Sequence, residues 1–353
     1  MSLIAGDILG GMFGTKKTRV AINGFGRIGR AFFRLSMDDK SIEIVGINDL
    51  GDITNLAYLL KHDSVYRTLA ADISVDGSNI VVNGKKIAVV SEKDATKLPW
   101  KDWNIDVVVE STGVYDSFEK SNAHIEAGAK RVVITAPVKD DSPLGATVLM
   151  GVNEEKMGMC KITSNASCTT NSASPVIAIL DAKIGIEKAL LNTTHSYTAT
   201  QSIVDGPVKG SDFRRGRSAA QNMAPSSTGA AIAVTKAYEQ LKGKFDGIAV
   251  RVPTVAGSLA DITFIAKRDT TVEEVNKILE DAAKEERWQG IFMATREQLV
   301  SSDIIGNTHA SIADLELTRV VGGNLVKVLA WYDNEMGYAH TLLVHVKRAA
   351  EHA

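Results

Sequence analysis

The stretch Asn23-Gly24-Phe25-Gly26-Arg27-Ile28-Gly29 decides the fold of this chain. It stands between a short apolar strand pattern and an amphipathic helical pattern. Glycines at this spacing have separate uses: Gly24 allows a tight turn, Gly26 lets backbone approach a pyrophosphate, and Gly29 lets the helix pack on the strand. The N-terminus of the helix then offers free N–H groups and a partial positive charge to the phosphates. The stretch therefore predicts a dinucleotide-binding turn.

An acidic residue supports this interpretation. Asp49 closes the next apolar run, 20 residues after Gly29 (49 − 29). A carboxylate at that offset accepts hydrogen bonds from both ribose hydroxyls and repels a 2′-phosphate, so NAD is favoured over NADP. The strand–turn–helix context favours a cofactor site over a glycine-rich turn followed by a surface aspartate.

Short β-branched runs alternate with helical patterns through the first half of the chain. The expected strands are Arg19–Ile22, Ile42–Ile47, Asp106–Glu110, Arg131–Thr135 and Thr147–Val152. Near-continuous apolar strands separated by helices are typical of a parallel sheet that is buried on both faces. A hairpin within Ile80–Ser91 interrupts the pattern, because Asn83-Gly84 supplies the positive φ of a two-residue turn. We expect it to leave the parallel sheet.

The second half changes to longer strands with fewer crossovers, an α+β pattern. Strands are expected at Leu190–Tyr197, Gly247–Val252, Ala260–Ala266 and Asn324–Trp331, and helices at Thr169–Lys183, Ala230–Tyr238 and Val272–Glu285. Pro175 lies inside the first helix, where proline should kink the helix or delay its start.

These patterns predict an α/β protein of two domains. Residues 17–167 would form a Rossmann-type parallel-sheet NAD-binding domain, and residues 168–334 an α+β catalytic domain with a large mixed sheet. Residues 1–16 would be an N-terminal extension, and a C-terminal helix within 335–353 would return to the first domain.

Composition narrows the class of protein. A chain of 353 residues is longer than one hydrophobic core usually serves. The 44% apolar and 23% charged residues exclude disorder and collagen-like structure. A net charge of −2 gives no support to binding of nucleic acid or of an anionic membrane. No apolar stretch approaches the ~18 residues of a membrane span. The leader's cations follow its apolar part, unlike a secretory signal, and two cysteines cannot form a disulfide framework, so we expect a cytoplasmic protein.

Cys168 is the candidate nucleophile. It stands in Ser164-Asn165-Ala166-Ser167-Cys168-Thr169-Thr170-Asn171, directly before a helical pattern. A helix N-terminus favours a thiolate, and its Ser and Thr neighbours can cap the helix or bind an oxyanion. Cys160, in an apolar run, is interpreted as packing. His195 lies 27 residues after Cys168 (195 − 168) at the end of an expected strand, and it could supply the base that a reactive thiol needs.

Anion sites are indicated in the second half. Arg214, Arg215 and Arg217 fall in a glycine-rich loop, Arg251 opens Arg-Val-Pro-Thr, and residues 226–229 precede a helical run whose N-terminus could hold phosphate. A solvated arginine loop beside an N-cap explains these residues equally well at this point. RNA binding is disfavoured, because no aromatic platform interleaves with the arginines.

A dinucleotide, an activated thiol and anion sites together indicate oxidation of a phosphorylated aldehyde through a covalent thioester. Eight blocks extend this inference: Ile22–Arg30, Asn48-Asp49, Glu110–Gly113, Ser164–Asn171, His195–Thr198, Ser226–Ala231, Arg251–Thr254 and Trp331–Glu335. In these blocks, in this order, the chain resembles the phosphorylating glyceraldehyde-3-phosphate dehydrogenases from about Lys17 to its C-terminus. The block around Cys168 is the most specific.

The resemblance implies NAD-dependent oxidative phosphorylation of D-glyceraldehyde 3-phosphate to 1,3-bisphosphoglycerate by a homotetramer. Cys168 would form the thiohemiacetal, and His195 would keep the thiolate poised, accept the hydroxyl proton and stabilise the oxyanion. The substrate's phosphate would be held by Thr198 and Arg251, with Arg215 as a further member of the anion sites. The attacking inorganic phosphate would be held by Ser167, Thr169, Thr228 and Gly229. NAD would be held by Gly24, Gly26, Arg27, Ile28, Gly29, Asp49, Lys93, Thr135 and Asn334. No metal-ligating residue is assigned.

Departures and alternatives remain in view. Val255-Ala256-Gly257 replaces the family's usual Pro-Asn-Val beside Arg251, and Ser172 replaces a common second cysteine. Erythrose-4-phosphate dehydrogenase shares the scaffold and would release an acid by hydrolysing the thioester. Aspartate-semialdehyde dehydrogenase would prefer a substrate that bears a carboxylate. A dinucleotide-binding thiol sensor would be oxidised at Cys168 and would have no use for phosphate sites.

Overall fold

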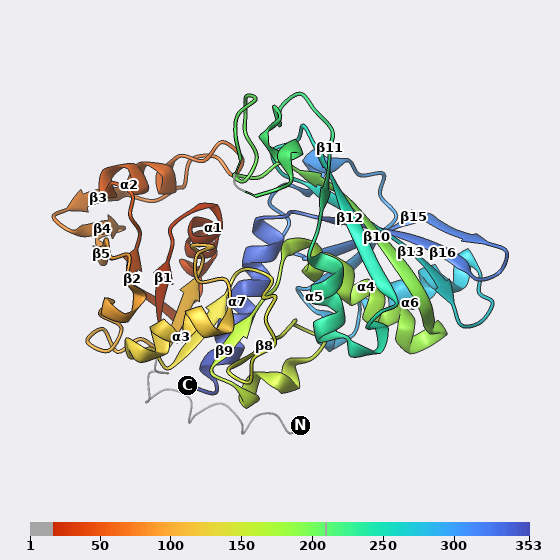
Figure 1. The fold of residues 1–353 in the computed structure, drawn as a ribbon, viewed down its shortest axis with the longest axis horizontal. Helices are drawn as coiled ribbons and strands as arrows, with labels where there is room; N and C mark the ends of the chain where they lie inside the picture. Colours follow the sequence, from red (N-terminus) through yellow and green to blue (C-terminus); the bar gives the residue numbers. More distant parts are fainter. Residues whose placement is uncertain (1–16, 209) are drawn as a thin grey trace, which may run out of the picture.

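The computed structural model describes residues 17–208 and 210–353, arranged around two β-sheets (Figure 1). The predicted N-terminal extension, residues 1–16, lies outside the described residues. Among the described residues, no helix combines the length and the hydropathy that crossing a membrane would require.

The first sheet has nine strands in the order β3-β4-β5-β2-β1-β6-β7-β9-β8. Their bounds are β1 Thr18–Asn23, β2 Ile42–Asn48, β3 Ile73–Asp76, β4 Asn79–Val82, β5 Lys85–Val90, β6 Val107–Glu110, β7 Arg131–Ile134, β8 Gly145–Thr147 and β9 Ile162–Ser164. All pairings are parallel except β3–β4 and β4–β5. Because β1 lies between β2 and β6, the strand order reverses at β1, and such a switch point opens a ligand crevice at the carboxyl ends of the strands. This is the predicted Rossmann-type sheet.

Helices accompany this sheet: α1 Arg27–Ser36, α2 Ile53–Lys61 and α3 Phe118–Glu126. The C-terminal helix α7, Met336–Ala350, packs against α1, β6 and β7. Residues from the far end of the chain therefore join the first sheet, as the sequence predicts.

The structure differs from two local predictions made from the sequence. Asn83 and Gly84 do form a two-residue turn with φ of 49° and 79°. The hairpin does not leave the sheet, however, because β5 pairs in parallel with β2. The strand expected at Thr147–Val152 is wrong: β8 ends at Thr147 and a turn follows. Val148 and Met150 gave the strand-like pattern because their side chains are buried in the core.

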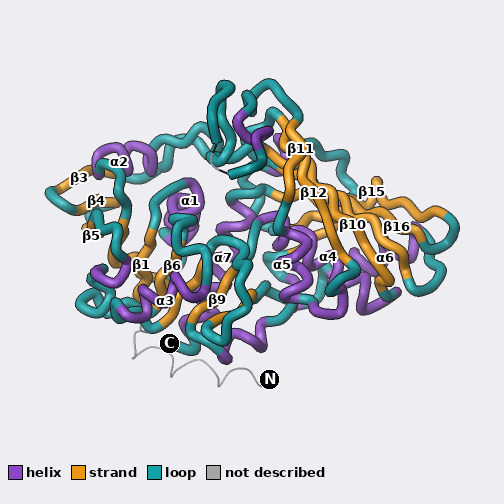
Figure 2. The backbone as a smooth tube through the Cα atoms, viewed as in Figure 1, coloured by secondary structure: helices purple, strands orange, loops and turns teal. Residues whose placement is uncertain are grey.

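The second sheet is mixed and has seven strands in the order β11-β12-β10-β13-β16-β15-β14. Their bounds are β10 Ile186–Ser196, β11 Ala224–Ser227, β12 Phe245–Val252, β13 Ser258–Ala266, β14 Phe292–Thr295, β15 Ser311–Val321 and β16 Leu325–Tyr332. The helices α4 Cys168–Ile184, α5 Ala230–Ala237 and α6 Val272–Ala282 lie along one side of it (Figures 1 and 2). Short 3-10 turns complete the described elements: η1 Ala95–Lys97, η2 Glu154–Met159, η3 Phe213–Gly216, η4 Glu239–Leu241, η5 Glu286–Trp288 and η6 Ser301–Ile304.

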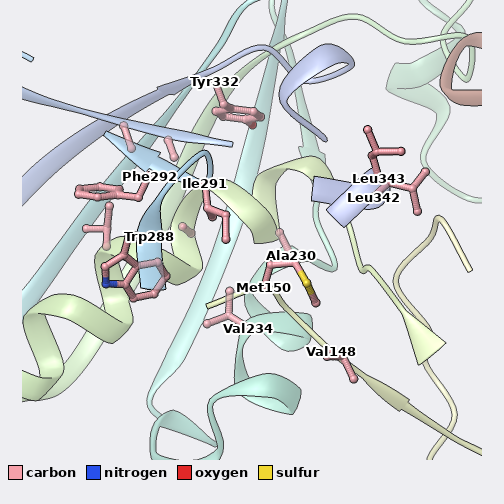
Figure 3. Close-up of a cluster of buried hydrophobic side chains, with 14 of the residues drawn as sticks. Val148, Met150, Ala230, Val234, Trp288, Ile291, Phe292, Tyr332, Leu342 and Leu343 are labelled. Atoms are coloured by element: carbon pink, nitrogen blue, oxygen red, sulfur yellow. The ribbon is translucent and has the colours of Figure 1, made fainter. Parts of the chain in front are cut away.

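One hydrophobic core spans both halves of the chain. Figure 3 shows Val148 and Met150 of the first half near Ala230 and Val234 of α5, with Leu342 of α7 beside them. Helix α4 is continuous across Pro175 and is buried along most of its length, so tertiary packing overrides the cost of proline. The two sheets are therefore held in a defined relation, and the start of α4 faces the end of the first sheet.

Candidate active site

The glycine turn has the form that its spacing predicts. Gly24 has φ of +95°, and a Cβ there would lie 2.7 Å from the carbonyl carbon of Ser111. A Cβ on Gly29 would lie 2.3 Å from the carbonyl oxygen of Gly24. A Cβ on Gly26 would meet no atom within 4 Å. The protein's own packing thus requires two of the glycines, while the third leaves open space at the N-terminus of α1, where a pyrophosphate fits.

The carboxylate of Asp49 hydrogen bonds to the backbone of this turn. Asp49 follows β2, and its carboxylate accepts the N–H of Phe25 at 2.6 Å and the N–H of Gly51 at 2.8 Å. A cavity of about 510 Å³ adjoins it, lined by Asn23, Gly24, Gly26, Asn48, Asp49, Leu50, Glu92, Lys93, Ser111, Thr112, Val114 and Tyr115. A cleft with an acid at one wall and the glycine turn at the other fits the adenosine half of NAD. Sequence patterns pointed to Asp49 and Lys93 but missed the wall formed by Asn23, Asn48 and Thr112.

Three further residues are predicted to contact the cofactor: Arg27, Ile28 and Thr135. The guanidinium of Arg27 pairs with Asp63 at 2.8 Å and with Glu335, and these carboxylates raise its pKa above the usual arginine value. That side chain is therefore paired with two carboxylates, which favours the backbone of Arg27 as the phosphate contact. Ile28 packs half-buried against the core, and Thr135 directly follows β7.

Asn334 is oriented by three donors. Its Oδ1 accepts from Ser196 Oγ at 2.6 Å, from Ser258 Oγ at 3.1 Å and from the N–H of Gly257 at 3.2 Å. A backbone N–H can only donate, so this atom is the amide oxygen and the Nδ2 donor points to the other side. Such an orientation suits a residue that must recognise a carboxamide oxygen.

Cys168 and His195 meet at the start of α4. Ser167 caps the helix by accepting the N–H of Thr170 at 3.1 Å, and Cys168 is the first helical residue. Cys168 Sγ lies 3.3 Å from His195 Nε2, and His195 is the second-last residue of β10. His195 is 3% exposed, whereas Cys168 is partly exposed. The predicted thiol–imidazole pair is thus brought together at the N-terminus of α4.

Burial and the charge of Arg251 shift the pKa values of both members of the pair. Burial raises the pKa of the Cys168 thiol, against the opposing effects of the Arg251 charge and of hydrogen bonds from Thr169. Burial and the positive charge of Arg251 lower the pKa of His195 to about 3. The lowered pKa favours a neutral His195 imidazole. Burial of the sulfur opposes the thiolate that the helix N-terminus and Arg251 favour.

Three predicted anion-binding side chains lie around His195. Arg251 Nη1 is 2.7 Å from His195 Nδ1. Arg215 donates to Ser226 Oγ at 2.9 Å and to Thr200 Oγ1 at 3.3 Å, and the Thr200 hydroxyl is 3.0 Å from that of Thr198. Burial lowers the pKa of Arg251, and repulsion from the Arg215 guanidinium lowers it further. An anion placed between them would relieve this repulsion.

The residues predicted to hold inorganic phosphate divide into two groups. Gly229 is the exposed N-cap of α5, and Thr228 Oγ1 accepts the N–H of Ala230 at 3.1 Å. Ser167 is partly exposed at the cap of α4, which packs against α5. Thr169 differs, because its side chain is buried and its hydroxyl lies 2.8 Å from that of Tyr332. Its binding of phosphate stays a prediction.

Two tyrosines were missed from the sequence. The buried Tyr332 hydroxyl joins Thr169 and Thr193, and its ring meets His195 edge-on with centroids 5.9 Å apart. Tyr338 of α7 donates to the carbonyl of Ala166 at 3.0 Å, where the backbone takes a φ of +52° just before Cys168. The place of Tyr332 in the Trp331–Glu335 block was the available signal for that residue, but the partners of both tyrosines lie more than 130 residues away.

A cofactor crevice joined to a domain that presents a thiol beside an imidazole defines an NAD-dependent oxidoreductase. Comparison with known families makes this specific. Residues 18–118 match the model of the glyceraldehyde 3-phosphate dehydrogenase NAD binding domain, and residues 167–334 match that of the C-terminal domain.

Similar proteins agree. Glyceraldehyde-3-phosphate dehydrogenase of Priestia megaterium is 46% identical over 327 residues, which is 92% of this chain and 96% of that protein. Glyceraldehyde-3-phosphate dehydrogenase 1 of Bacillus subtilis has the same identity and coverage. Glyceraldehyde-3-phosphate dehydrogenase 2 of Synechocystis is 47% identical over 330 residues, again 92% and 96% of the two chains. This chain therefore belongs to the glyceraldehyde-3-phosphate dehydrogenase family, and NAD is its cofactor.

Proposed function

We propose that this protein oxidises D-glyceraldehyde 3-phosphate and transfers the acyl group to inorganic phosphate, which releases 1,3-bisphosphoglycerate. The observation that carries the proposal is the 3.3 Å approach of Cys168 Sγ to His195 Nε2 at the start of α4, in a chain of this family. NAD, when bound, accepts the hydride that leaves the aldehyde carbon. The glycine turn, Asp49 and Asn334 would hold it, with Lys93 at the wall of the adenosine cavity.

The first step is addition of the thiol to the aldehyde. A bond forms between Sγ and the carbonyl carbon, the π pair moves to oxygen, and the thiol proton passes through His195 Nε2 to that oxygen. The imidazole is neutral near pH 7. For Nε2 to accept the thiol proton, the ring must carry its own proton on Nδ1, where the carbonyl oxygen of Ser196 accepts it at 2.7 Å, and Arg251 must turn from Nδ1 to the substrate phosphate. A substrate phosphate bound by Arg251 would offset the charge that lowers the pKa of His195. Substrate binding would thus make the imidazole a stronger base at the moment it is needed.

The second step converts the thiohemiacetal to a thioester. The hydroxyl proton moves to His195 Nε2 as the hydride leaves the same carbon. In the third step an oxygen of inorganic phosphate attacks the thioester carbonyl, the carbon–sulfur bond breaks, and its electron pair returns to sulfur. His195 returns its proton to the sulfur, and the proton of the attacking phosphate goes to solvent. The cycle releases the acyl phosphate, reduced cofactor and one proton.

Two anion sites fit the two phosphates of this reaction. Thr198, Arg215 and Arg251 would hold the substrate's own phosphate beside His195. Ser167, Thr228 and Gly229 would hold the attacking phosphate between the N-termini of α4 and α5, where backbone N–H groups favour an anion. Thr169, whose hydroxyl also contacts that of Tyr332, would join them.

The assay is NADH absorbance with glyceraldehyde 3-phosphate, NAD and phosphate. NADH formation that needs phosphate and is lost in Cys168→Ser is expected. Phosphate-independent turnover would point to an enzyme that hydrolyses its thioester, such as erythrose-4-phosphate dehydrogenase. No NADH under any of these conditions would overturn the proposal.

We further propose a homotetramer in the cytoplasm. Leu190 of β10 and Ile248 of β12 are 65% and 54% exposed on the second sheet, and Ile203, Val204, Phe213 and Met223 are at least 60% exposed in the loop region before β11. Apolar surface of this extent is typical of a contact between copies. Light scattering should give about four times the chain mass of 37.8 kDa, and a mass of one chain would refute assembly.

The domain division is also a proposal. Residues 17–167 with 335–353 would form the cofactor domain, and 168–334 the catalytic domain. The separate sheets β1–β9 and β10–β16 and the packing of α7 on α1 support it. Limited proteolysis should cleave first at exposed loops and leave fragments that end near these boundaries.

A further inference from the structure

A buried carboxylate lies beneath the adenosine cavity. Glu110 is the last residue of β6 and is 2% exposed. One oxygen accepts from His124 Nε2 at 3.0 Å and from Asn23 Nδ2, and the other accepts the N–H of Thr112 at 2.8 Å and its hydroxyl. Four donors saturate the carboxylate, and none of them belongs to a lysine or an arginine.

Trp100 determines which ring nitrogen of His124 carries the proton. Trp100 Nε1 lies 3.0 Å from His124 Nδ1, and both side chains are fully buried. An indole nitrogen can only donate, so Nδ1 is the acceptor. The neutral ring then carries its proton on Nε2, which donates it to Glu110. Trp100 thus orients His124, and His124 orients Glu110.

The same hydrogen bonds continue to the cofactor side. Asn23 Oδ1 accepts from Asn48 Nδ2 at 2.6 Å, and Asn48 Oδ1 accepts the N–H of Glu92 at 2.9 Å. These residues stand at or just after the ends of β1, β2 and β5. Asn23, Asn48, Glu92 and Thr112 all line the cavity beside Asp49. Glu110, His124 and Trp100 are not among the residues that line it.

We propose that Glu110 and His124 are positioning residues for NAD: they fix the ends of β1, β2, β5 and β6 in the geometry that binds the adenosine half. This inference rests on the proposed function, because it assigns that cavity to NAD. Walls that are set before binding spare the cofactor the cost of ordering them, so the network contributes to affinity without touching the ligand. The Cys168–His195 pair is built on other elements and does not depend on it.

The decisive variant is Glu110→Gln. It keeps the size of the side chain and one oxygen for Thr112, but its amide nitrogen then faces two donors, Asn23 Nδ2 and His124 Nε2. Asn23 cannot turn its amide without losing the bond from Asn48. The Kd and KM for NAD should therefore rise by roughly tenfold, the loss expected for hydrogen bonds to a buried charged group. The kcat at saturating NAD should stay within about twofold of the wild-type value, since the reacting groups are untouched.

Val109→Ala is the matched control. Val109 precedes Glu110 on β6, is fully buried and carries no polar atom. It should lower the melting temperature and leave the Kd for NAD unchanged. Trp100→Phe removes the donor that sets the His124 tautomer and should raise the Kd by a few fold, so the proposal can be tested even if Glu110→Gln does not fold.

The Kd is measured by calorimetric titration with NAD, and KM and kcat are measured by steady-state kinetics. A Kd within twofold of wild type in both Glu110→Gln and Trp100→Phe would overturn the positioning role. An equal rise in Val109→Ala would also overturn it, because affinity would then follow stability alone. A wild-type protein that does not bind NAD would instead refute the proposed function.

Discussion

Gly26 provides the sharpest test of the cofactor site, because the folded protein can accept a side chain at this position and a bound pyrophosphate could not. Its φ of −69° suits any residue, and an added Cβ meets nothing within 4 Å. Gly26→Ala should therefore change the free energy of unfolding by no more than about 0.5 kcal/mol. If the open space belongs to the pyrophosphate, the same methyl group should weaken NAD binding by a factor of ten or more.

The magnitude follows from ligand linkage. NAD at 100 times its Kd stabilises the wild-type protein by about 2.7 kcal/mol. At the same concentration, binding that is tenfold weaker leaves about 1.4 kcal/mol, and binding that is a hundredfold weaker leaves about 0.4 kcal/mol. Thermal melts with and without NAD would show this as a reduced shift from an unchanged starting temperature.

Gly29→Ala is the matched comparison. Its Cβ would lie 2.3 Å from the carbonyl oxygen of Gly24, so it should lose roughly 2 kcal/mol or more of stability before any cofactor is added. The reasoning is refuted if Gly26→Ala keeps the full NAD-dependent shift, or if it destabilises the protein as much as Gly29→Ala.

The other predictions concern the thiol pair and the ribose site. Cys168→Ser should reduce NADH formation by roughly a thousandfold or more, while Cys160→Ser keeps wild-type rates; equal losses would remove the special role of Cys168. The pKa of His195 is lowered to about 3, below its unfolded value of about 6.5, so the unfolded state binds the proton first and stability falls as pH drops from about 6.5 towards 3. His195→Asn should therefore lose about 2 kcal/mol less than wild type in urea titrations between pH 7 and pH 5, and identical losses would contradict the buried neutral imidazole. Asp49→Asn should raise the KM for NAD and lower that for NADP in initial-rate assays; an unchanged ratio would show that the carboxylate does not read the ribose.

Chemistry that is local in the chain could be predicted from the sequence. The glycine turn, Asp49 and the cap before Cys168 each depend on a few neighbouring residues, because a turn, a strand end and a helix start are local structures. The meeting of Cys168 with His195 needed one further assumption, that strand β10 returns along helix α4. A sequence pattern can therefore predict a residue's position when that position depends only on the helix, strand or turn that contains the residue.

Side-chain commitments across the fold could not be predicted. Thr169 is a predicted phosphate ligand, yet its hydroxyl also contacts that of Tyr332, 163 residues away. Arg27 is a predicted cofactor contact, yet its guanidinium pairs with Glu335, 308 residues away. Strand β15 was missed because it joins the sheet by pairing with β14 and β16, and its polar and apolar residues do not alternate cleanly. These contacts depend on which helices and strands lie side by side in the fold. The periodicity of the sequence does not contain that information.

The C-terminal helix connects the two halves of the proposed chemistry. Glu335, directly before α7, pairs with Arg27 at the glycine turn, and Tyr338 in its first turn holds the carbonyl of Ala166 before the nucleophile. About two turns further on, His345 Nδ1 lies 3.1 Å from Asn165 Oδ1. Because Ala166 has a positive φ that a residue with a side chain rarely adopts, the turn needs outside support to persist. The start of this helix and the residue before it thus contact both the cofactor turn and the backbone before Cys168, so we expect this segment to fix the position of the nucleophile relative to the bound cofactor.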